Sequence, residues 1–291
     1  MIEFEEIDIK HRSKYEEFLA TSGIVSCEYS FLGLWAWKES ERGEVYFDNN
    51  ICWLRNRRGV LSPICYPEQD WANVISQNFP DGVELYDVPE KLAFKLSSLR
   101  GAQVEELRTE WEYVYPVKEL IELKGRCYSQ KRAHVKFFEE KYRSKYASLI
   151  EEDFDELIKF QNEWLERHKN DIAASTLYEE NQAIMKALEN WNDFPLFGAY
   201  IRINGHIAAY TIAEELNSET IDIRFEKAFT EYEGIYQFLN RTFLSRQAEN
   251  YIWVNKEEDM GDEGLRQAKL SYHPTHYEKK YLVSISSKFH F

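Results

Sequence analysis

Ionisable side chains are concentrated in residues 253–274, WVNKEEDMGDEGLRQAKLSYHP. Most of them follow a short apolar strand that is predicted over residues 251–254. On a helix beginning near residue 260, a spacing of i, i+3 and i+7 would place three of them on one side: Arg266, Lys269 and His273. Helix capping by Asp259 or Asp262, with cations near the C-terminal end of the helix dipole, is the alternative interpretation. Capping leaves the polar residues at the strand exit unexplained, so we predict a substrate site there.

Acyl transfer is a reaction that such residues can support without a nucleophilic side chain. It needs a donor and an acceptor held in line, a proton acceptor and a group that stabilises the oxyanion. We predict Glu226 or Glu257 as the proton acceptor, and Lys269 or Arg266 as the oxyanion partner. No Ser-His-Asp or Cys-His arrangement can be recognised in the sequence.

Glu226 ends a strand-like run in which period-two alternation would put it on one face with Asp222 and Arg224. Charged side chains on a central strand need either ion-pair partners or a polar cleft. Both interpretations are open, and we favour the cleft. Tyr236 and Asn240, four residues apart on the next predicted helix, could point into such a cleft, or Tyr236 could simply pack. The side chains predicted to contact substrate are Tyr236, Asn240, Asn255, Asp259, Tyr272 and His273.

Composition limits the classes of protein to which the chain can belong. With 291 residues and 44% hydrophobic content, the chain can form two packed domains. A net charge of −15 argues against general nucleic-acid binding. The four cysteines show no CxxC spacing, so we expect reduced thiols and no metal site. The sequence contains no bilayer-spanning apolar run and starts with an acidic segment, so a cytoplasmic protein is expected.

The segment 124–145 has the opposite sign, with a net charge of +6 and an apolar stripe that is expected to pack between two lobes. Such a local reversal suits a phosphate-bearing partner such as tRNA, a lipid headgroup or a coenzyme. Lys131 and Arg132 are the candidate phosphate contacts within this segment. A solvated connecting helix that balances acidic neighbours is the alternative interpretation.

Hydrophobic periodicity predicts a mixed α/β fold in which one element order occurs twice. In the second half the order is β-α-α-β-β-β-α-β-α-β. Asn204-Gly205 marks a two-residue hairpin between the strands 195–203 and 206–213, and the last strand covers 280–285. In the first half the last strand runs over 104–115. The predicted domains are a lobe over 1–120, a basic connecting helix over 121–144 and a second lobe over 145–291.

This repeated order resembles the GNAT acyltransferase fold. Three blocks resemble the phosphatidylglycerol lysyltransferase C-terminal-domain family: LKGRCYSQKRAHVKFF (123–138), IRFEKAFTEYEGIYQFLNRTF (223–243) and VNKEEDMGDEGLRQAKLSYHP (254–274). The resemblance extends across nearly the whole chain. It implies two tandem GNAT-like lobes with a substrate cleft between them, related to the Fem aminoacyltransferases. It also implies transfer of an aminoacyl group, which the better-understood relatives move from a charged tRNA to a lipid headgroup.

The GNAT resemblance also implies a coenzyme A pyrophosphate loop of the form Q/R-x-x-G-x-G/A. The aligned residues 231–236 read EYEGIY, so only Gly234 is kept as a phosphate-binding candidate and two glutamates flank it. This loop suits a cationic group better than a pyrophosphate. The equivalent residues 65–70 have no glycine, so we expect the first lobe to be structural.

These observations favour an acyl- or aminoacyltransferase that acts on a small amine or aminoacyl substrate in the interlobe cleft. Its donor would be aminoacyl-tRNA or acyl-coenzyme A. Two alternatives are a coenzyme A-dependent N-acetyltransferase and a non-catalytic binding protein for a cationic ligand.

Overall fold

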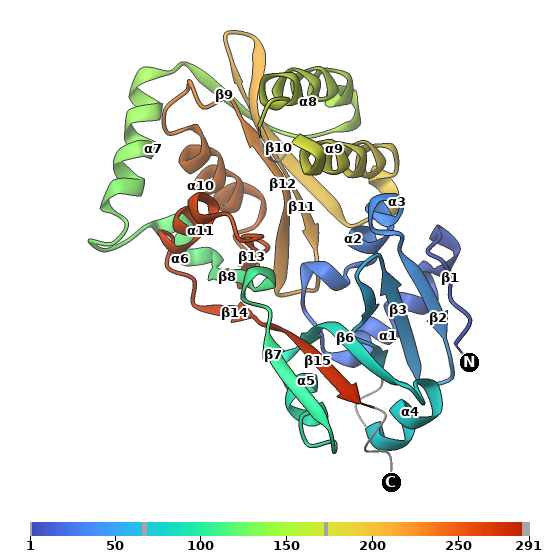
Figure 1. The fold of residues 1–291 in the computed structure, drawn as a ribbon. Coiled ribbons are helices and arrows are strands. Elements are labelled where there is room, and N and C mark those ends of the chain that lie inside the picture. Colours follow the sequence, from blue (N-terminus) through green and yellow to red (C-terminus); the bar gives the residue numbers. More distant parts are fainter. Residues whose placement is uncertain (1, 66–68, 172–173, 287–291) are drawn as a thin grey trace. The chain divides into compact units, whose positions relative to one another are not determined.

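The computed structural model describes residues 2–65, 69–171 and 174–286 (Figure 1). The chain forms two compact units. Unit 1 comprises Met1–Glu112, Glu258–Asp262 and Tyr277–Phe291, and unit 2 comprises Tyr113–Glu257 and Glu263–His276. Part of the glycine-free stretch 65–70 lies outside the described residues. None of the helices in the described part of the chain has the length and apolar character that crossing a bilayer requires.

Unit 2 contains a seven-stranded sheet. Its strands β12 and β13 run parallel, whereas β13–β8, β12–β11, β11–β10 and β10–β9 are antiparallel pairs. The predicted Asn204-Gly205 turn is confirmed, since both residues have the positive φ (52° and 88°) that a tight hairpin requires. The strands in spatial order are β14 (His276–Glu278), β8 (Glu112–Pro116), β13 (Trp253–Asn255), β12 (Thr220–Ala228), β11 (His206–Glu215), β10 (Leu196–Ile203) and β9 (Ser144–Ser148).

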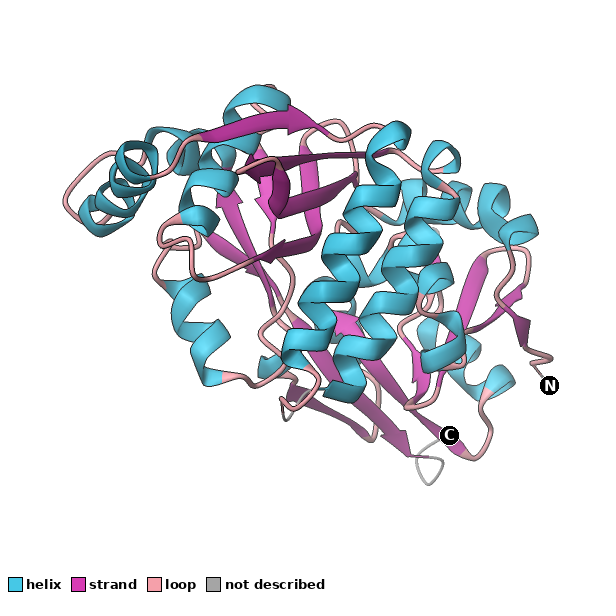
Figure 2. Ribbon diagram, turned by 90° about the horizontal axis from the view of Figure 1, so that it is seen from above, coloured by secondary structure: helices cyan, strands magenta, loops and turns pink. Residues whose placement is uncertain are grey.

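Helices cover both faces of this sheet. On one face α8 (Phe154–His168) and α9 (Ala174–Glu189) lie side by side (Figure 2). On the other face α10 (Ile235–Gln247) packs against α7 (Ser129–Lys141), with the rings of Phe138 and Phe238 stacked 4.7 Å apart. The basic helix α7 is therefore a packed part of unit 2, together with α6 (Val117–Glu122) and α11 (Glu263–Leu270).

Unit 1 has its own sheet, in the order β1-β2-β3-β4-β6-β15-β7, with β5 paired to β3. Its core gathers Trp53, Leu85 and Val283, all fully buried. The strands are β1 (Glu5–Glu6), β2 (Glu44–Phe47), β3 (Ile51–Asn56), β4 (Gly59–Leu61), β5 (Ile64–Cys65), β6 (Gly82–Pro89), β7 (Ala102–Glu106) and β15 (Lys280–Ser286). The helices are α1 (Arg12–Ser22), α2 (Phe31–Ala36), α3 (Lys38–Glu41), α4 (Trp71–Asn78) and α5 (Glu90–Leu96).

The mixed α/β fold is confirmed, but two strands were assigned to the wrong sheet. The predicted strand 104–115 is two strands, because the 3-10 turn η3 (Arg108–Glu110) separates β7 from β8. β7 stays in unit 1, whereas β8 pairs with β13 in unit 2. Conversely, the predicted last strand of the second half is β15, which lies between β6 and β7 in unit 1. The lobe boundaries at 120 and 145 and the internal repeat stay predictions.

Candidate functional site

The parallel strands β12 and β13 separate early. Their ladder consists of three residue pairs and ends at Asp222 opposite Asn255. Residues 223–228 of β12 continue beyond it without a partner in β13. Ligands of α/β sheets bind near such carboxyl ends of parallel strands, where neighbouring chain segments diverge. The side chains on residues 223–228 of β12 are therefore candidates for a ligand-binding or catalytic site.

A β-bulge decides which of these side chains share a face. Ala213 pairs with Ile223, but Ile212 pairs with Phe225, so Arg224 is an extra residue in β12. Opposite Asp222 stands Glu214, and opposite Glu226 stands Thr211. Because Glu214 and Thr211 are an odd number of residues apart on β11, Asp222 and Glu226 face opposite sides of the sheet. The prediction that they share one face is wrong.

Glu226 points to the side of the sheet that α10 covers. Ala228, two residues further along β12, belongs to the apolar cluster of α10, and Lys227 pairs with Glu180 of α9 on the other side. The carboxylate Oε1 of Glu226 is 3.8 Å from the Lys256 Nζ, and its Oε2 is buried and has no hydrogen-bond partner within the described parts of the chain. An unsatisfied buried carboxylate oxygen is costly, and a bound ligand is one way to satisfy it.

Two tyrosines interact with this carboxylate, and Asn240 follows Tyr236 one turn later on α10. The Tyr236 hydroxyl accepts a hydrogen bond from the Ala228 amide at 3.1 Å. Burial and the nearby Glu226 charge raise the pKa of Tyr236 to about 12, and the same two causes raise the pKa of Tyr272. Both hydroxyls therefore stay protonated and can donate hydrogen bonds. Asn240 is 3% exposed, and its Oδ1 has no hydrogen-bond partner among the described residues.

Two lysines lie next to Tyr272. Lys131 of α7 donates a hydrogen bond to the Ser271 Oγ at 2.6 Å, and its Nζ is 3.9 Å from the centre of the Tyr272 ring. The Lys256 Nζ is 5.9 Å from the same ring centre. Burial, and then the charge of Lys256, lower the pKa of Lys131. Lys256 and Ser271 were not singled out from the sequence, although Lys256 belongs to the polar crowding at the strand exit.

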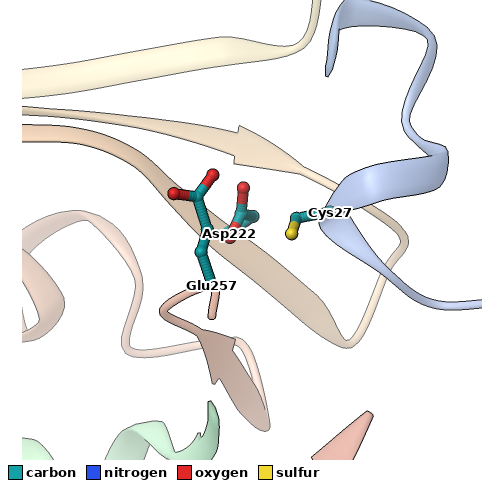
Figure 3. A group of neighbouring side chains, drawn as sticks. All are labelled: Cys27, Asp222 and Glu257. Carbon is teal, nitrogen blue, oxygen red and sulfur yellow. The ribbon is translucent and has the colours of Figure 1, made fainter. Parts of the chain in front are cut away.

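On the opposite face of β12, Arg224 has internal ion pairs rather than a polar cleft. Its Nε is 2.8 Å from Glu214 and 3.1 Å from Asp222, and its NH1 is 3.2 Å from Glu257. The carboxylates of Asp222 and Glu257 lie within 4.8 Å of one another (Figure 3), and Cys27, also drawn there, is a residue of unit 1. The structure therefore groups Glu257, a predicted base, with Arg224 and not with Glu226.

Several other predicted site residues have partners that hold the local backbone. The Lys269 Nζ donates to the Lys256 carbonyl at 2.6 Å, which fixes the loop after β13. The Asn255 Oδ1 accepts from the Glu257 amide at 2.8 Å within the same loop. Asp259 is in unit 1, where it pairs with Arg108 at 3.3 Å. These contacts position the chain, and they do not bring these side chains to Glu226.

The predicted helix near residue 260 begins later and ends earlier than expected. α11 spans Glu263–Leu270, and His273 follows it with a left-handed φ of 56°. His273 therefore does not continue the helical face of Arg266 and Lys269, and its ring packs edge-on against Tyr128 at 5.4 Å. The Arg266 NH1 lies 3.7 Å from Glu263, one helical turn away.

The two remaining phosphate candidates are also engaged locally. Arg132 donates through NH1 to the carbonyls of Leu123 and Gly125, so it closes the loop before α7. Gly234 starts α10 with a φ of 87°, and a Cβ there would collide with the His134 carbonyl of α7. In the same loop the Tyr232 and Ile235 amides are hydrogen-bonded to backbone carbonyls. Helix α7 thus packs on the loop 231–236, which aligns with the pyrophosphate-binding loop of GNAT enzymes.

Comparison with known proteins assigns the chain to a family. The model of the phosphatidylglycerol lysyltransferase C-terminal family matches residues 22–284, and the chain belongs to this family. The family that the three sequence blocks resembled is therefore confirmed.

Individual relatives cover nearly the full chain. A conserved protein of unknown function from Bacteroides thetaiotaomicron has 27% identity and a TM-score of 0.88, over 98% of this chain and 100% of that one. The C-terminal domain of a putative lysylphosphatidylglycerol synthetase from Agrobacterium fabrum shares the fold, with 15% identity, a TM-score of 0.65 and coverage of 94% and 92%. An uncharacterized protein of Mycoplasmoides gallisepticum is 23% identical over 96% of this chain and 98% of that one.

Proposed function

We propose that unit 2 transfers an aminoacyl or acyl group to an amine, with Glu226 as the proton acceptor. The proposal rests on the Oε2 of Glu226 beside the diverging strands, which is buried and meets no hydrogen-bond partner among the residues that the structure describes. Membership in a family named for lysyl transfer to phosphatidylglycerol supports aminoacyl transfer as the reaction class. The proposal uses residues of unit 2 alone, and both the interlobe cleft and a tRNA contact through the basic helix stay predictions.

In the proposed reaction the acceptor amine attacks the carbonyl carbon of an ester donor. A C–N bond forms, the ester C–O bond breaks, and the amine proton passes to Glu226 and then to the leaving hydroxyl oxygen. The protonated Tyr236 and Tyr272 hydroxyls donate hydrogen bonds to the oxyanion. The Lys256 Nζ lies 3.8 Å from the Glu226 carboxylate and places a positive charge beside the proposed proton acceptor.

Coenzyme A is the less favoured donor. Its pyrophosphate would need free backbone amides at the start of α10. The Tyr232 and Ile235 amides already bond to carbonyls, and α7 fills the space beside Gly234. The glutamates Glu231 and Glu233 add negative charge to the same loop. An aminoacyl ester, whose amino group is cationic, meets no such repulsion.

The test is a transfer assay with radiolabelled aminoacyl-tRNAs and cell extract as the acceptor source. We expect label in an alkali-stable amide product, and Glu226→Gln should lower the rate at least about 100-fold because the proton has no acceptor. Glu163→Gln is the matched control, since Glu163 lies on α8 and pairs with Arg167 at the surface. Its rate should equal that of the unchanged protein.

Three other outcomes would remove the proposal. Turnover of acetyl-coenzyme A without turnover of any aminoacyl-tRNA would make the protein an N-acetyltransferase. A rise in melting temperature with amines, without turnover of either donor, would indicate a binding protein for cationic ligands. Unchanged turnover in Glu226→Gln, with an unchanged melting temperature, would exclude this residue from the mechanism.

A further inference from the structure

Lys131 is half-buried and has no carboxylate partner among the described residues. Its ammonium group has two neighbours, the Ser271 hydroxyl at 2.6 Å and the ring of Tyr272. The charged group that acts on it most directly is a second cation, Lys256. Burial and repulsion from Lys256 therefore both raise the free energy of the charged form of Lys131.

Lys256 is only partly neutralised. Its side chain is 15% exposed, and its nearest carboxylate oxygen, on Glu226, is 3.8 Å away, which is longer than a charge-assisted hydrogen bond. Taken together, the two lysines and Glu226 leave one positive charge in a confined place around Tyr272. The Lys269 hydrogen bond to the Lys256 carbonyl and the Lys131 hydrogen bond to Ser271 hold this arrangement in place.

We propose that Lys131, held by Ser271, and Lys256 form a binding site for one oxyanion, a phosphate or a carboxylate group of the transferred or accepting substrate. The two ammonium groups supply the charged donors that a phosphate or carboxylate oxygen accepts. The Ser271 hydroxyl donates its own proton to the Ala268 carbonyl at 2.6 Å, so its part is to hold Lys131 in place. One bound monoanion would cancel the remaining positive charge. The ligand's place in the reaction rests on the proposed function, whereas the binding itself does not.

The site lies close to the proposed chemistry. Lys256 links the two places, since its Nζ is 3.8 Å from the Glu226 carboxylate and 5.9 Å from the centre of the Tyr272 ring, which also contacts Lys131. A substrate held by its anionic group at the lysines would therefore extend past Tyr272 toward Glu226. Of the three predicted phosphate contacts, the proposed anion site keeps Lys131 and leaves out Arg132 and Gly234, which are engaged elsewhere.

Binding of inorganic phosphate, acetate, adenosine 5′-monophosphate and uncharged adenosine, measured by calorimetry on the full chain, tests the proposal. Tighter binding of either phosphate ligand than of acetate identifies a phosphate source, and the reverse identifies a carboxylate source. Lys131→Met and Lys256→Met should each weaken the tighter anion at least about tenfold, because each removes a hydrogen bond to a charged group. Lys136→Met is the matched control, since Lys136 lies on the same helix with a side chain 74% exposed.

A second measurement on the unchanged protein covers the case in which a variant does not fold. The anion should protect Lys131 from acetylation by an amine-reactive reagent and leave Lys136 unprotected. No binding of any anion, or equal binding by Lys131→Met, would overturn the inference, as would absence of protection. The protein could bind an anion through Lys131 and yet show no transferase activity. That result would support the anion site and contradict only the proposed function.

Discussion

Lys280 in unit 1 and Lys131 in unit 2 are both withdrawn from water, but their surroundings differ. Lys280 is 2% exposed, and its Nζ lies 2.6 Å from the Glu112 carboxylate. Although burial lowers the pKa of Lys280, the Glu112 charge more than offsets it and raises that pKa well above its usual value. Lys131 is half-buried and pairs with no carboxylate in the described part of the chain, and burial and then the Lys256 charge lower its pKa.

This difference distinguishes Lys280, whose charge is balanced within the protein, from Lys131, whose charge is available to a ligand. Glu112 also accepts hydrogen bonds from the Ser26 hydroxyl and the Cys27 amide, so the lysine and its surroundings in unit 1 are complete by themselves. Such a pair needs nothing from outside the chain. Lys131 in unit 2 contacts the Ser271 hydroxyl and the Tyr272 ring, and neither group carries a negative charge. A substrate anion could balance the charge of Lys131.

The largest effect is expected when the complete pair is broken. Lys280→Met leaves Glu112 buried without its cation, and the free energy of unfolding should fall by about 3–5 kcal/mol. Lys131→Met removes a charge that has no carboxylate partner, so the loss should stay below about 1 kcal/mol. Urea unfolding of both variants measures the contrast. Equal losses would show that the two lysines do not differ in the way described.

The carboxyl groups around Lys280 should make stability depend on pH. Burial, and then the charge of Glu28, raise the pKa of Asp87 to about 7; burial, and then Glu112, raise that of Glu278 to about 7. Between about pH 4.5 and 7 the folded state keeps protons that the unfolded state has lost, so their contribution to stability falls as pH rises.

We expect each of these groups to contribute a loss of about 1–3 kcal/mol across that window. Glu278→Gln should make the loss smaller, because the amide does not titrate. Unfolding free energies at a series of pH values test this prediction. An identical pH profile in the variant and the unchanged protein would contradict the raised pKa of Glu278.

A smaller effect is expected one residue from Lys131. Arg132→Met removes the hydrogen bonds to the Leu123 and Gly125 carbonyls, which should cost about 1–2 kcal/mol of stability. Anion binding should be unchanged, because Arg132 is directed to the loop before α7. If phosphate binding were weaker in this variant and stability almost unchanged, Arg132 would belong to the anion site. The contrast between Lys131 as a ligand-binding lysine and Lys280 as a structural one would then be weaker.

Local patterns predicted the elements of unit 2 well. The Asn204-Gly205 turn, the long periodic helices and the short strand before residue 256 are all present, because each depends on nearby residues alone. The partners of β8 and β15 could not be predicted in this way. A strand's sequence shows that it is half-buried, but not which of two sheets contains its neighbour.

The candidate site was predicted in part. The structure brings together Glu226, Tyr236, Tyr272 and Lys131, whereas Glu257 faces Arg224 and Asp259 pairs with Arg108. The missing signal was the β-bulge at Arg224, which reverses the alternation that the sequence pattern assumed. A single extra residue in a strand leaves no mark in composition or periodicity over so short a run.

The most direct test of the central claim is a single-turnover measurement with a saturating aminoacyl donor. This condition isolates the chemical step from binding, so it reports on the proton acceptor alone. Glu226→Gln should slow amide formation at least about 100-fold while donor affinity and melting temperature stay unchanged. A single-turnover rate equal to that of the unchanged protein would contradict the role of Glu226.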